Sequence, residues 1–359
     1  MKVKKVRKYR VIGIMSGTSL DGVDIAYCRF VLKKKAWTFS IPAALTLPYE
    51  HEWKSRLSKA HRLSGEALAD LNTKYGKFLG QRCRQFITQK KIKKIDGIAS
   101  HGHTIFHQPK NKFTYQLGDG NALQAATGLP VVFDFRSLDV ALGGEGAPLV
   151  PLGDKLLFSD FDICLNLGGI ANLSMNMRGE RRAFDICFCN MMLNYLAAKT
   201  QLDFDKDGKM ARQASVNPNL LNSFEKIYHA RGKKYPSLGR EGFEKDFQHL
   251  LDDESIPLGD RLRTACELIA DEIARSIPSS EKRKLLATGG GAHNGFLIEL
   301  IARKLSPNTK VIVPKKTIVN FKEALVFAFL GVLRMRGEVN VLKSVTGASR
   351  DSCSGVLIG

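Results

Sequence analysis

In the first part of this chain, segments whose hydrophobic positions are typical of β-strands alternate with segments whose hydrophobic positions are typical of α-helices. Apolar and β-branched residues fill residues 10–15 and 23–30, which predicts two strands joined by a loop of small and polar residues. Apolar residues at helical spacing predict a long amphipathic helix over residues 65–89. The further elements expected in this part are strands at 95–100 and 129–133 and a helix at 120–127.

The second part of the chain repeats the strand–glycine turn–strand arrangement at residues 162–167 and 170–177. Strands alternate with helices in both parts, which is typical of the α/β class. Residues 134–151 and 203–260 have too little periodicity for regular structure, so we expect these two segments to be irregular. The remaining elements expected here are strands ending at 185 and spanning 284–288 and 311–313, and helices at 190–199, 264–277, 295–305 and 321–334.

Length and composition narrow the class of protein. A chain of 359 residues with 44% hydrophobic content predicts two folded domains and excludes disorder as its main state. We find no run of about 18 apolar residues, so we expect no membrane span. A basic N-terminus precedes an apolar run at residues 11–15, but that run is too short for a secretory signal. We therefore expect a cytoplasmic protein.

Positive charge is concentrated in the first third of the chain. The 55 Lys and Arg against 35 Asp and Glu give a net charge of +20, and residues 1–120 carry +16 of it, from 24 basic and 8 acidic residues. Such asymmetry is found in proteins that bind nucleic acids or other polyanions. The basic residues form short clusters without interleaved aromatic residues, however, so we favour a solvated surface and expect no nucleic-acid partner.

The seven cysteines are scattered through the sequence and are odd in number. Their spacing matches neither a disulfide framework nor a zinc site of the CxxC type. We therefore expect reduced thiols.

The two glycines of the loop at residues 17–22 have the same spacing as those of a phosphate-binding P-loop, but the residues that follow differ. Val23 and Asp24 stand where a P-loop has Lys and Ser or Thr, and this loop joins two strands where a P-loop opens a helix. Its glycines and hydroxyl side chains can still bring donors close to a phosphate. Asp21 in such a loop is compatible with a Mg²⁺ ion held through water. A plain hairpin turn is the alternative for this loop taken alone.

Two further glycine loops occur in the second part. Gly168 and Gly169 repeat the strand–loop–strand arrangement, and two such hairpins facing each other could clamp a triphosphate. The loop at residues 289–291 lies between a strand and a helix, where glycines let a nucleoside pack against backbone and a helix N-terminus adds partial positive charge.

Together these residues resemble a known family. The motifs are, in order, Met15-Ser-Gly-Thr-Ser-Leu-Asp-Gly22, His101-Gly-x-Thr-Ile, Gly143-Gly-x-Gly-Ala-Pro-Leu-Val150, Leu167-Gly-Gly-Ile-Ala-Asn172, Phe184-Asp185, Asp205-x-Asp-Gly208, Gly239-Arg-Glu241 and Gly289-Gly-Gly-Ala-x-Asn-Gly295. In order and spacing they are similar to the motifs of the anhydro-N-acetylmuramic acid kinases over nearly the whole chain.

The resemblance implies an α/β fold of two ribonuclease-H-like lobes, of the actin, hexokinase and sugar-kinase type, with ATP and Mg²⁺ bound in the cleft. We expect residues 1–133 with 337–359 to form the first lobe and residues 134–336 the second. It also implies that water opens the 1,6-anhydro bond of 1,6-anhydro-N-acetylmuramic acid while O6 takes the γ-phosphoryl group, giving N-acetylmuramic acid 6-phosphate and ADP in peptidoglycan recycling. A small amino sugar is then the partner, and the family suggests a homodimer.

The resemblance also implies roles for particular residues. Asp185 stands at the position of the family's base, which removes a proton from the water that attacks C1. A helix N-cap is the alternative for Asp185 taken alone. Expected substrate contacts are His101, Thr104, Asp134 and Arg136, with an inter-lobe ion pair as the alternative for the last two. Expected nucleotide contacts are Gly17, Thr18, Ser19, Leu20, Asp21, Gly22, Val23, Asp24, Gly168, Gly169, Asn172, Gly289, Gly290, Gly291 and Asn294, with Asp21 also expected to hold Mg²⁺ through water.

Two departures from the family pattern leave alternatives open. Residues 186–189 are Ile-Cys-Phe-Cys where the family commonly has Thr-Gly-Pro-Gly, so the chain could be a kinase of another sugar on the same fold. We expect Cys187 and Cys189 to be packing residues. His103 replaces a glutamine, and a metal-dependent hydrolase built on His101 and His103 is a further alternative. We favour hydrogen-bonding or substrate-contacting histidines over metal ligands.

Overall fold

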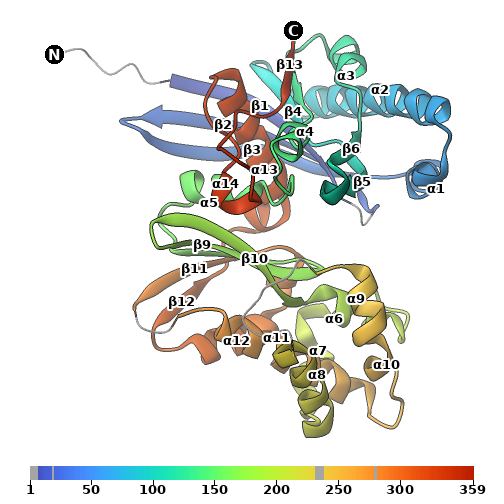
Figure 1. Cartoon of the computed structure of the whole chain (residues 1–359), viewed down its shortest axis with the longest axis vertical. Coiled ribbons are helices and arrows are strands. Elements are labelled where there is room, and N and C mark those ends of the chain that lie inside the picture. Colours follow the sequence, from blue (N-terminus) through green and yellow to red (C-terminus); the bar gives the residue numbers. More distant parts are fainter. Residues whose placement is uncertain (1–6, 18–19, 231–237, 279–280) are drawn as a thin grey trace. The chain divides into compact units, whose positions relative to one another are not determined.

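The computed structural model describes residues 7–17, 20–230, 238–278 and 281–359. The chain divides into two compact units (Figure 1), and their sequence ranges are interleaved. Unit 1 comprises Met1–Ser159 and Phe321–Gly359, and unit 2 comprises Asp160–Asn320. The first unit is therefore discontinuous, and the second is inserted into it.

Unit 1 is built on a six-stranded sheet in the order β13-β7-β4-β1-β2-β3. The first three strands form an antiparallel meander, β4 and β7 join parallel to β1, and β13 closes the other edge antiparallel to β7. The strands span Arg7–Ser16 (β1), Gly22–Lys33 (β2), Ala36–Pro48 (β3), Gly97–Ser100 (β4), Val131–Phe133 (β7) and Val356–Ile358 (β13), and a separate hairpin comprises His103–Gln108 (β5) and Phe113–Leu117 (β6).

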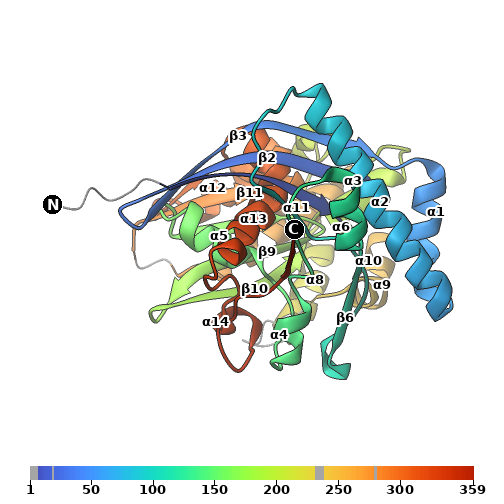
Figure 2. The same cartoon turned by 90° about the horizontal axis from the view of Figure 1, so that it is seen from above.

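Helices cover both faces of this sheet. The long helix α2 (Gly65–Gln89) buries Tyr75, Phe78 and Leu79 against strand residues such as Ile12, and α3 lies beside it (Figure 2). On the opposite face, Gly13 of β1 meets the backbone of α13 (Lys316–Met335). The other helices of unit 1 are His51–Lys59 (α1), Gly120–Thr127 (α3), Ser137–Ala141 (α4), Val150–Leu157 (α5) and Lys343–Thr346 (α14), with short 3-10 turns at Ala60–Arg62 (η1) and Pro109–Asn111 (η2).

Unit 2 repeats the same topology in a smaller sheet, in the order β10-β9-β8-β11-β12. Its first three strands are again an antiparallel meander, and β11 and β12 again join parallel to the first strand. The internal repeat expected from the sequence is thereby confirmed, as is the α/β class. The strands span Ile163–Leu167 (β8), Ile170–Met177 (β9), Glu180–Phe188 (β10), Arg283–Thr288 (β11) and Thr309–Ile312 (β12).

The helix α11 (Leu258–Arg275) is central to the packing of unit 2, because it contacts α6, α7, α8, α12 and β10. Its buried residues include Leu262, Leu268 and Ile269. The remaining helices of this unit are Asn190–Ala198 (α6), Lys209–Gln213 (α7), Pro218–Ala230 (α8), Arg240–Asp246 (α9), Gln248–Leu251 (α10) and Gly295–Leu305 (α12), with 3-10 turns at Lys206–Gly208 (η3) and Gly290–His293 (η4).

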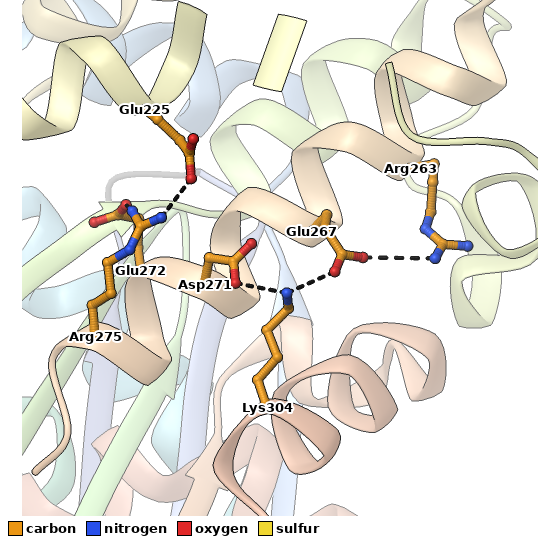
Figure 3. Close-up of polar contacts among 7 residues, drawn as sticks. All are labelled: Glu225, Arg263, Glu267, Asp271, Glu272, Arg275 and Lys304. Atoms are coloured by element: carbon orange, nitrogen blue, oxygen red, sulfur yellow. Dashed lines mark hydrogen bonds and ion pairs between the residues drawn. The ribbon is translucent and has the colours of Figure 1, made fainter. Parts of the chain in front are cut away.

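A row of charges on α11 ties it to its neighbours (Figure 3). Lys304 of α12 lies between Glu267 and Asp271, with N···O distances of 2.7 and 2.6 Å. Arg275 at the end of α11 pairs with Glu225 of α8 at 2.5 Å. Partly exposed pairs of this kind contribute modestly one by one, so this row mainly fixes the orientation of helices that the apolar core already holds.

The structure confirms the helices expected at 65–89, 120–127 and 295–305 and corrects the two segments expected to be irregular. Residues 134–151 contain α4 and the start of α5, and the described part of residues 203–260 contains η3, α7, α8, α9, α10 and the start of α11. Outside these two segments, the strands and α-helices that the pattern did not predict are β3, α1, β5, β6, β13 and α14.

The unit boundaries differ from the expected 133/134 and 336/337. The helix α5 stays with unit 1 because it packs on β3, where Phe158 and Phe39 lie 5.2 Å apart between ring centroids, and because Asp154 pairs with Lys322 of α13 at 2.7 Å in a buried ion pair. The second boundary falls within α13, at Phe321, where the backbone leaves helical geometry.

Among the described residues, no helix is long and apolar enough to cross a membrane. All seven cysteines are free of disulfides, and all but Cys353 are buried.

The contact of Gly13 with α13 gives a test of this packing. A Cβ on Gly13 would lie 1.9 Å from the carbonyl oxygen of Ala324, and this oxygen belongs to the backbone of α13, which cannot move away as a flexible side chain could. We expect Gly13→Ala to lower the free energy of unfolding by about 3 kcal/mol or more, as measured by urea denaturation. Gly65→Ala is the matched control, because Gly65 begins α2 with no atom near its Cβ position, and it should be neutral or slightly stabilising. Equal stability of the two variants would contradict the packing described.

Candidate active site

The first glycine loop connects β1 to β2 in unit 1. Thr18 and Ser19 lie outside the described residues. Leu20 donates its backbone N–H to the Gly17 carbonyl at 3.4 Å and has a φ of 58°. Gly22 lies against β3 so closely that a Cβ would be 2.4 Å from the carbonyl oxygen of Leu47. Leu20 is therefore held next to Gly17, and the end of the loop is seated on the neighbouring strand.

Two carboxylates flank this turn. Asp21 is exposed, whereas Asp24 is half-buried on β2 and accepts a hydrogen bond of 2.5 Å from the Thr46 hydroxyl. Burial raises the pKa of Asp24, and the charge of Asp21 adds to this effect. A cation bound here would relieve the repulsion between the two groups. The side chain of Val23 is fully buried in the core, so this residue can offer a ligand only its backbone.

A buried chain of hydroxyl groups and one imidazole supports the loop at its base. Ser16, the last residue of β1, shares hydrogen bonds with Tyr49 at 2.7 Å and with Nδ1 of His103 at 2.9 Å. Tyr49 in turn contacts the hydroxyl of Tyr75 on α2 at 2.5 Å. Burial raises the pKa values of both tyrosines and lowers that of His103 to about 4, so all members of this chain are neutral near pH 7.

Two of the four expected substrate residues lie in direct contact. Nε and Nη2 of Arg136 donate to Nε2 of His101 at 3.0 and 2.8 Å, while Nδ1 of His101 faces the Gly102 carbonyl at 2.9 Å. Burial, together with the nearby Arg136, holds the pKa of His101 well below its usual range. Arg136 also donates to the Gly146 carbonyl at 2.6 Å, which anchors the loop that carries Gly143 and Gly144.

Asp139 anchors the same loop from its other side. This fully buried carboxylate accepts from the backbone N–H of Gly146 and from the Thr346 hydroxyl, each at 2.8 Å. Glu323 of α13 contributes an acidic group whose charge acts on Arg136. These acids hold Arg136 in its charged form, although burial lowers its pKa to about 10.

The other two expected substrate residues are placed differently. Asp134 has a φ of 53° and accepts from both the backbone and the hydroxyl of Ser137, at 3.2 and 2.5 Å, at the start of α4. Thr104 lies on β5 opposite Gln116 and is half-buried. The residues of unit 1 expected to contact nucleotide or substrate thus lie on β2 and β5, in the loop after β1 and in the segments after β4 and β7.

The histidines do not have the arrangement of a metal site. Both ring nitrogens of His101 have hydrogen-bond partners, and Nδ1 of His103 contacts Ser16. Within the described ranges, no group of three or more His, Cys, Asp or Glu could hold a metal ion. Hydrogen bonds thus occupy both ring nitrogens of His101 and one of His103, which favours hydrogen-bonding histidines over metal ligands.

In unit 2 the two remaining glycine loops pack on each other. Gly289 follows β11 with a φ of 83°, and a Cβ there would lie 2.8 Å from the Leu167 carbonyl oxygen. Gly291 is equally close to the side chain of Leu167. Gly168 and Gly169 accept hydrogen bonds through their carbonyls from the first residues around α6, including the N–H of Asn190 at 3.0 Å. Glycine is required at 289 because its φ is left-handed and a Cβ would meet the backbone of Leu167, and at 291 because a Cβ would meet Cβ of Leu167.

A row of polar side chains crosses the sheet beside these loops. Asn166 on β8 is paired with Asn172 on β9, which is paired with Asp185 on β10, so all three project from the same face. All three are half-buried. Oδ2 of Asp185 accepts from the backbone N–H of Leu238 at 3.0 Å, just before α9. The sheet thus places the expected base and one expected nucleotide residue side by side.

The segment that departs from the family pattern forms a β-bulge. The register of β10 shifts between Asp185 and Cys187, which inserts Ile186 as an extra residue. Cys187 and Cys189 are fully buried, as expected for packing residues, and burial raises the pKa of Cys189 to about 12. A bulge bends a strand and redirects its side chains, so this one sets the direction in which Asp185 points.

Asn294 is the N-cap of α12 and accepts from the backbone N–H of Leu297 at 3.0 Å. Asp207 caps the same helix by accepting from Gly295 at 2.9 Å, and Asp205 binds the N–H groups of Met210 and Ala211. These residues build the end of the third glycine loop. A nucleotide contact of Asn294 stays a prediction.

Comparison with known proteins agrees with this geometry. Residues 9–358 match the family described as anhydro-N-acetylmuramic acid kinase. The chain belongs to this family. It is 33% identical to a protein named anhydro-N-acetylmuramic acid kinase from Sulfurimonas denitrificans, over 96% of this chain and 98% of that protein. It is 34% identical to a protein of the same name from Vibrio parahaemolyticus, over 96% of this chain and 97% of that protein.

Among solved structures, the chain is similar to the activator of the 2-hydroxyisocaproyl-CoA dehydratase from Clostridium difficile with bound ADPNP. The TM-score is 0.44 and the identity 13%, over 91% of this chain and 97% of that chain.

Several residues of this family member were not singled out from the sequence. Asn166 lies two residues before Gly168, and its place in the glycine motif could have indicated it. Asn190 begins the next helix, and its side chain donates to the Leu167 carbonyl at 3.0 Å. Ser16 directly precedes Gly17 and could have been noted for the same reason. Asp139 and Glu323 were not identifiable, because their importance rests on contacts between distant segments.

The low pKa of His103 predicts a pH dependence of stability. Because the native imidazole resists protonation, the unfolded state binds more protons between about pH 6.5 and 4, and the protein loses stability as the pH falls through this window. Replacement by His103→Gln, which keeps a hydrogen-bonding group, should remove about 3 kcal/mol of this acid-induced loss, as measured by urea unfolding at pH 7 and pH 4. Exposed His51 provides the control, His51→Gln, which should leave the pH dependence unchanged. An unaltered pH dependence in His103→Gln would contradict the burial described.

Proposed function

We propose that this member of the anhydro-N-acetylmuramic acid kinase family uses ATP to phosphorylate O6 of 1,6-anhydro-N-acetylmuramic acid while water opens its anhydro bridge, as in peptidoglycan recycling. The single observation that best supports this is the polar row of Asn166, Asn172 and Asp185 beside two glycine loops packed on each other. It combines a carboxylate with backbone that can approach a phosphate closely.

In the proposed reaction, Asp185 is the general base. Its carboxylate takes a proton from a water molecule as that water attacks C1, and a C1–O bond forms. The bond between C1 and the bridging oxygen breaks, and this oxygen, now O6, attacks the γ-phosphorus of ATP. ADP leaves, and the sugar becomes N-acetylmuramic acid 6-phosphate. The N–H of Leu238 donates to Oδ2 of Asp185 at 3.0 Å and orients the carboxylate.

Phosphoryl transfer itself depends on positioning and on neutralising charge. The turn from Gly17 to Gly22 and the turn at Gly168 and Gly169 are proposed to contact the phosphates through backbone N–H groups. The loop from Gly289 to Gly291 is proposed to contact the nucleoside. Asp21 and Asp24 suit a hard cation, because their carboxylates repel each other without one, and we propose that they hold Mg²⁺ through water. When bound, Mg²⁺ would neutralise the phosphate charge.

Substrate recognition is proposed for unit 1. Arg136 is charged and rigidly held by His101 and Gly146, which suits it to orient an anionic sugar acid. Thr104 and Asp134 offer further polar groups for hydroxyls, although Asp134 already binds Ser137. Because the reaction consumes ATP, we propose that the enzyme acts in the cytoplasm. A homodimer stays a prediction, which light scattering of the purified protein can test.

The reaction can be tested directly. Incubation of the purified chain with ATP, Mg²⁺ and 1,6-anhydro-N-acetylmuramic acid in ¹⁸O-labelled water should give a product with one added phosphate and one ¹⁸O atom at C1, detected by mass spectrometry. N-acetylmuramic acid and other amino sugars serve as comparison substrates. Phosphorylation of one of these in preference to the anhydro sugar would instead support a kinase of another sugar. The bulge at Ile186, next to the expected base, is the feature that raises this alternative.

A substitution tests the base. Asp185→Asn keeps the size of the side chain but removes its basicity, so we expect turnover to fall at least about hundredfold. Binding of a non-hydrolysable ATP analogue, measured by calorimetry, should stay within about threefold of wild type. Asp253→Asn, at an exposed position of the same unit, is the control and should retain activity. An active Asp185→Asn enzyme would exclude Asp185 as the base.

A further inference from the structure

The strongest unexplained feature is a basic groove in unit 1, on residues that the proposed reaction does not use. Its volume is about 720 Å³, and it is formed by β1, β2 and β3 together with the loop that follows α2. The cations that line it are Lys8, Arg10, Arg29, Lys90, Lys91, Lys93 and Lys94.

The charges of this basic groove are uncompensated. In the described part of the chain, none of its cations forms an ion pair, and no carboxylate lines it. Asp96 lies next to the groove, where its carboxylate accepts the backbone N–H of Arg10 at 2.7 Å, and this single negative charge leaves the cations of the groove in large excess. The carboxyl end of α2 adds only a partial negative charge, which the full positive charges exceed. Like charges held together in this way repel one another, so an anion that enters the groove is favoured.

The shape and lining of the groove narrow the class of anion. Bases of single-stranded nucleic acids need exposed aromatic rings for stacking. Among the aromatic residues that line the groove, Tyr27 and Phe30 are buried. The other two pack against aromatic rings of unit 1, Tyr9 against Trp37 and Phe39 against Phe158. A concave surface also does not match a flat membrane. Hydroxyl groups of Thr38 and Ser40 line the wall opposite the lysine loop, and both residues are exposed.

We propose that the basic groove binds a compact phosphate-rich anion, namely a chain of several phosphoryl groups, at a place separate from the glycine loops. Lysines act as point charges that suit phosphate, and the groove offers cations from both of its walls, Lys8 and Arg29 from the strands and Lys93 and Lys94 from the loop. Such a ligand spans the groove and bridges the two walls. This binding does not depend on the proposed kinase reaction.

Inorganic tripolyphosphate is the probe for the test. Calorimetry is carried out on the full chain saturated with a non-hydrolysable ATP analogue, so that nucleotide-binding loops cannot account for the signal. We expect one tripolyphosphate per chain, with affinity that falls steeply as salt is raised. The variant Lys8→Gln/Lys93→Gln/Lys94→Gln should bind at least about tenfold more weakly. Its thermal unfolding should match wild type, because these side chains are exposed.

The control variant Lys54→Gln/Lys77→Gln/Lys343→Gln removes the same charge from exposed positions of unit 1 outside the groove, and its affinity should stay within about twofold of wild type. No binding of tripolyphosphate, or an equal loss in both variants, would overturn the proposal. Tighter binding of a hexa-aspartate peptide or of duplex DNA than of tripolyphosphate would also overturn it, in favour of an acidic peptide or a nucleic acid.

Discussion

Close approach of backbone to backbone, which only glycine permits, is the constraint on which both units depend. In unit 1, Gly13 allows the central strand to lie directly on α13. In unit 2, Gly289 and Gly291 allow one glycine loop to lie directly on another beside Leu167. A side chain at any of these positions would separate the elements by the width of a methyl group. The same property that closes the packing also leaves backbone N–H groups accessible to a phosphate.

Where hydrophobic periods are long, the sequence predicts the structure well. The helix at 65–89 carries about seven turns of consistent spacing. The first hairpin of each unit follows from two apolar runs separated by a glycine loop. Helices as short as α4 were missed because one turn contains too few apolar positions to define a period. The longer α8 was missed although Leu220, Phe224 and Tyr228 recur at every fourth position. The strand β3 was missed although Trp37, Phe39 and Ile41 alternate with small or polar residues, and its Pro42 is tolerated because β3 is an edge strand.

The candidate site was predictable only in part. Glycine loops, Asp185 and His101 stand in local motifs, so the sequence indicates them. The residues that hold them in place do not stand in local motifs, so the sequence does not indicate those. Contact of His101 with Arg136, and of Asp139 with Thr346 across 207 residues, arises from tertiary packing that no local pattern encodes. The unit boundaries were misplaced for the same reason, since the buried pair of Asp154 and Lys322 assigns α5 to the first unit.

The interleaved order of the two units has a consequence for biosynthesis. Residues 160–320 form a continuous segment, so unit 2 contains its whole sheet and core once that segment has left the ribosome. Unit 1 cannot complete its packing until α13 and β13 have been made, because one face of its sheet and one edge belong to the last 39 residues. The face around Gly13 therefore stays uncovered throughout synthesis of the inserted unit, and its apolar residues meet their final partners only when the last part of the chain has been made.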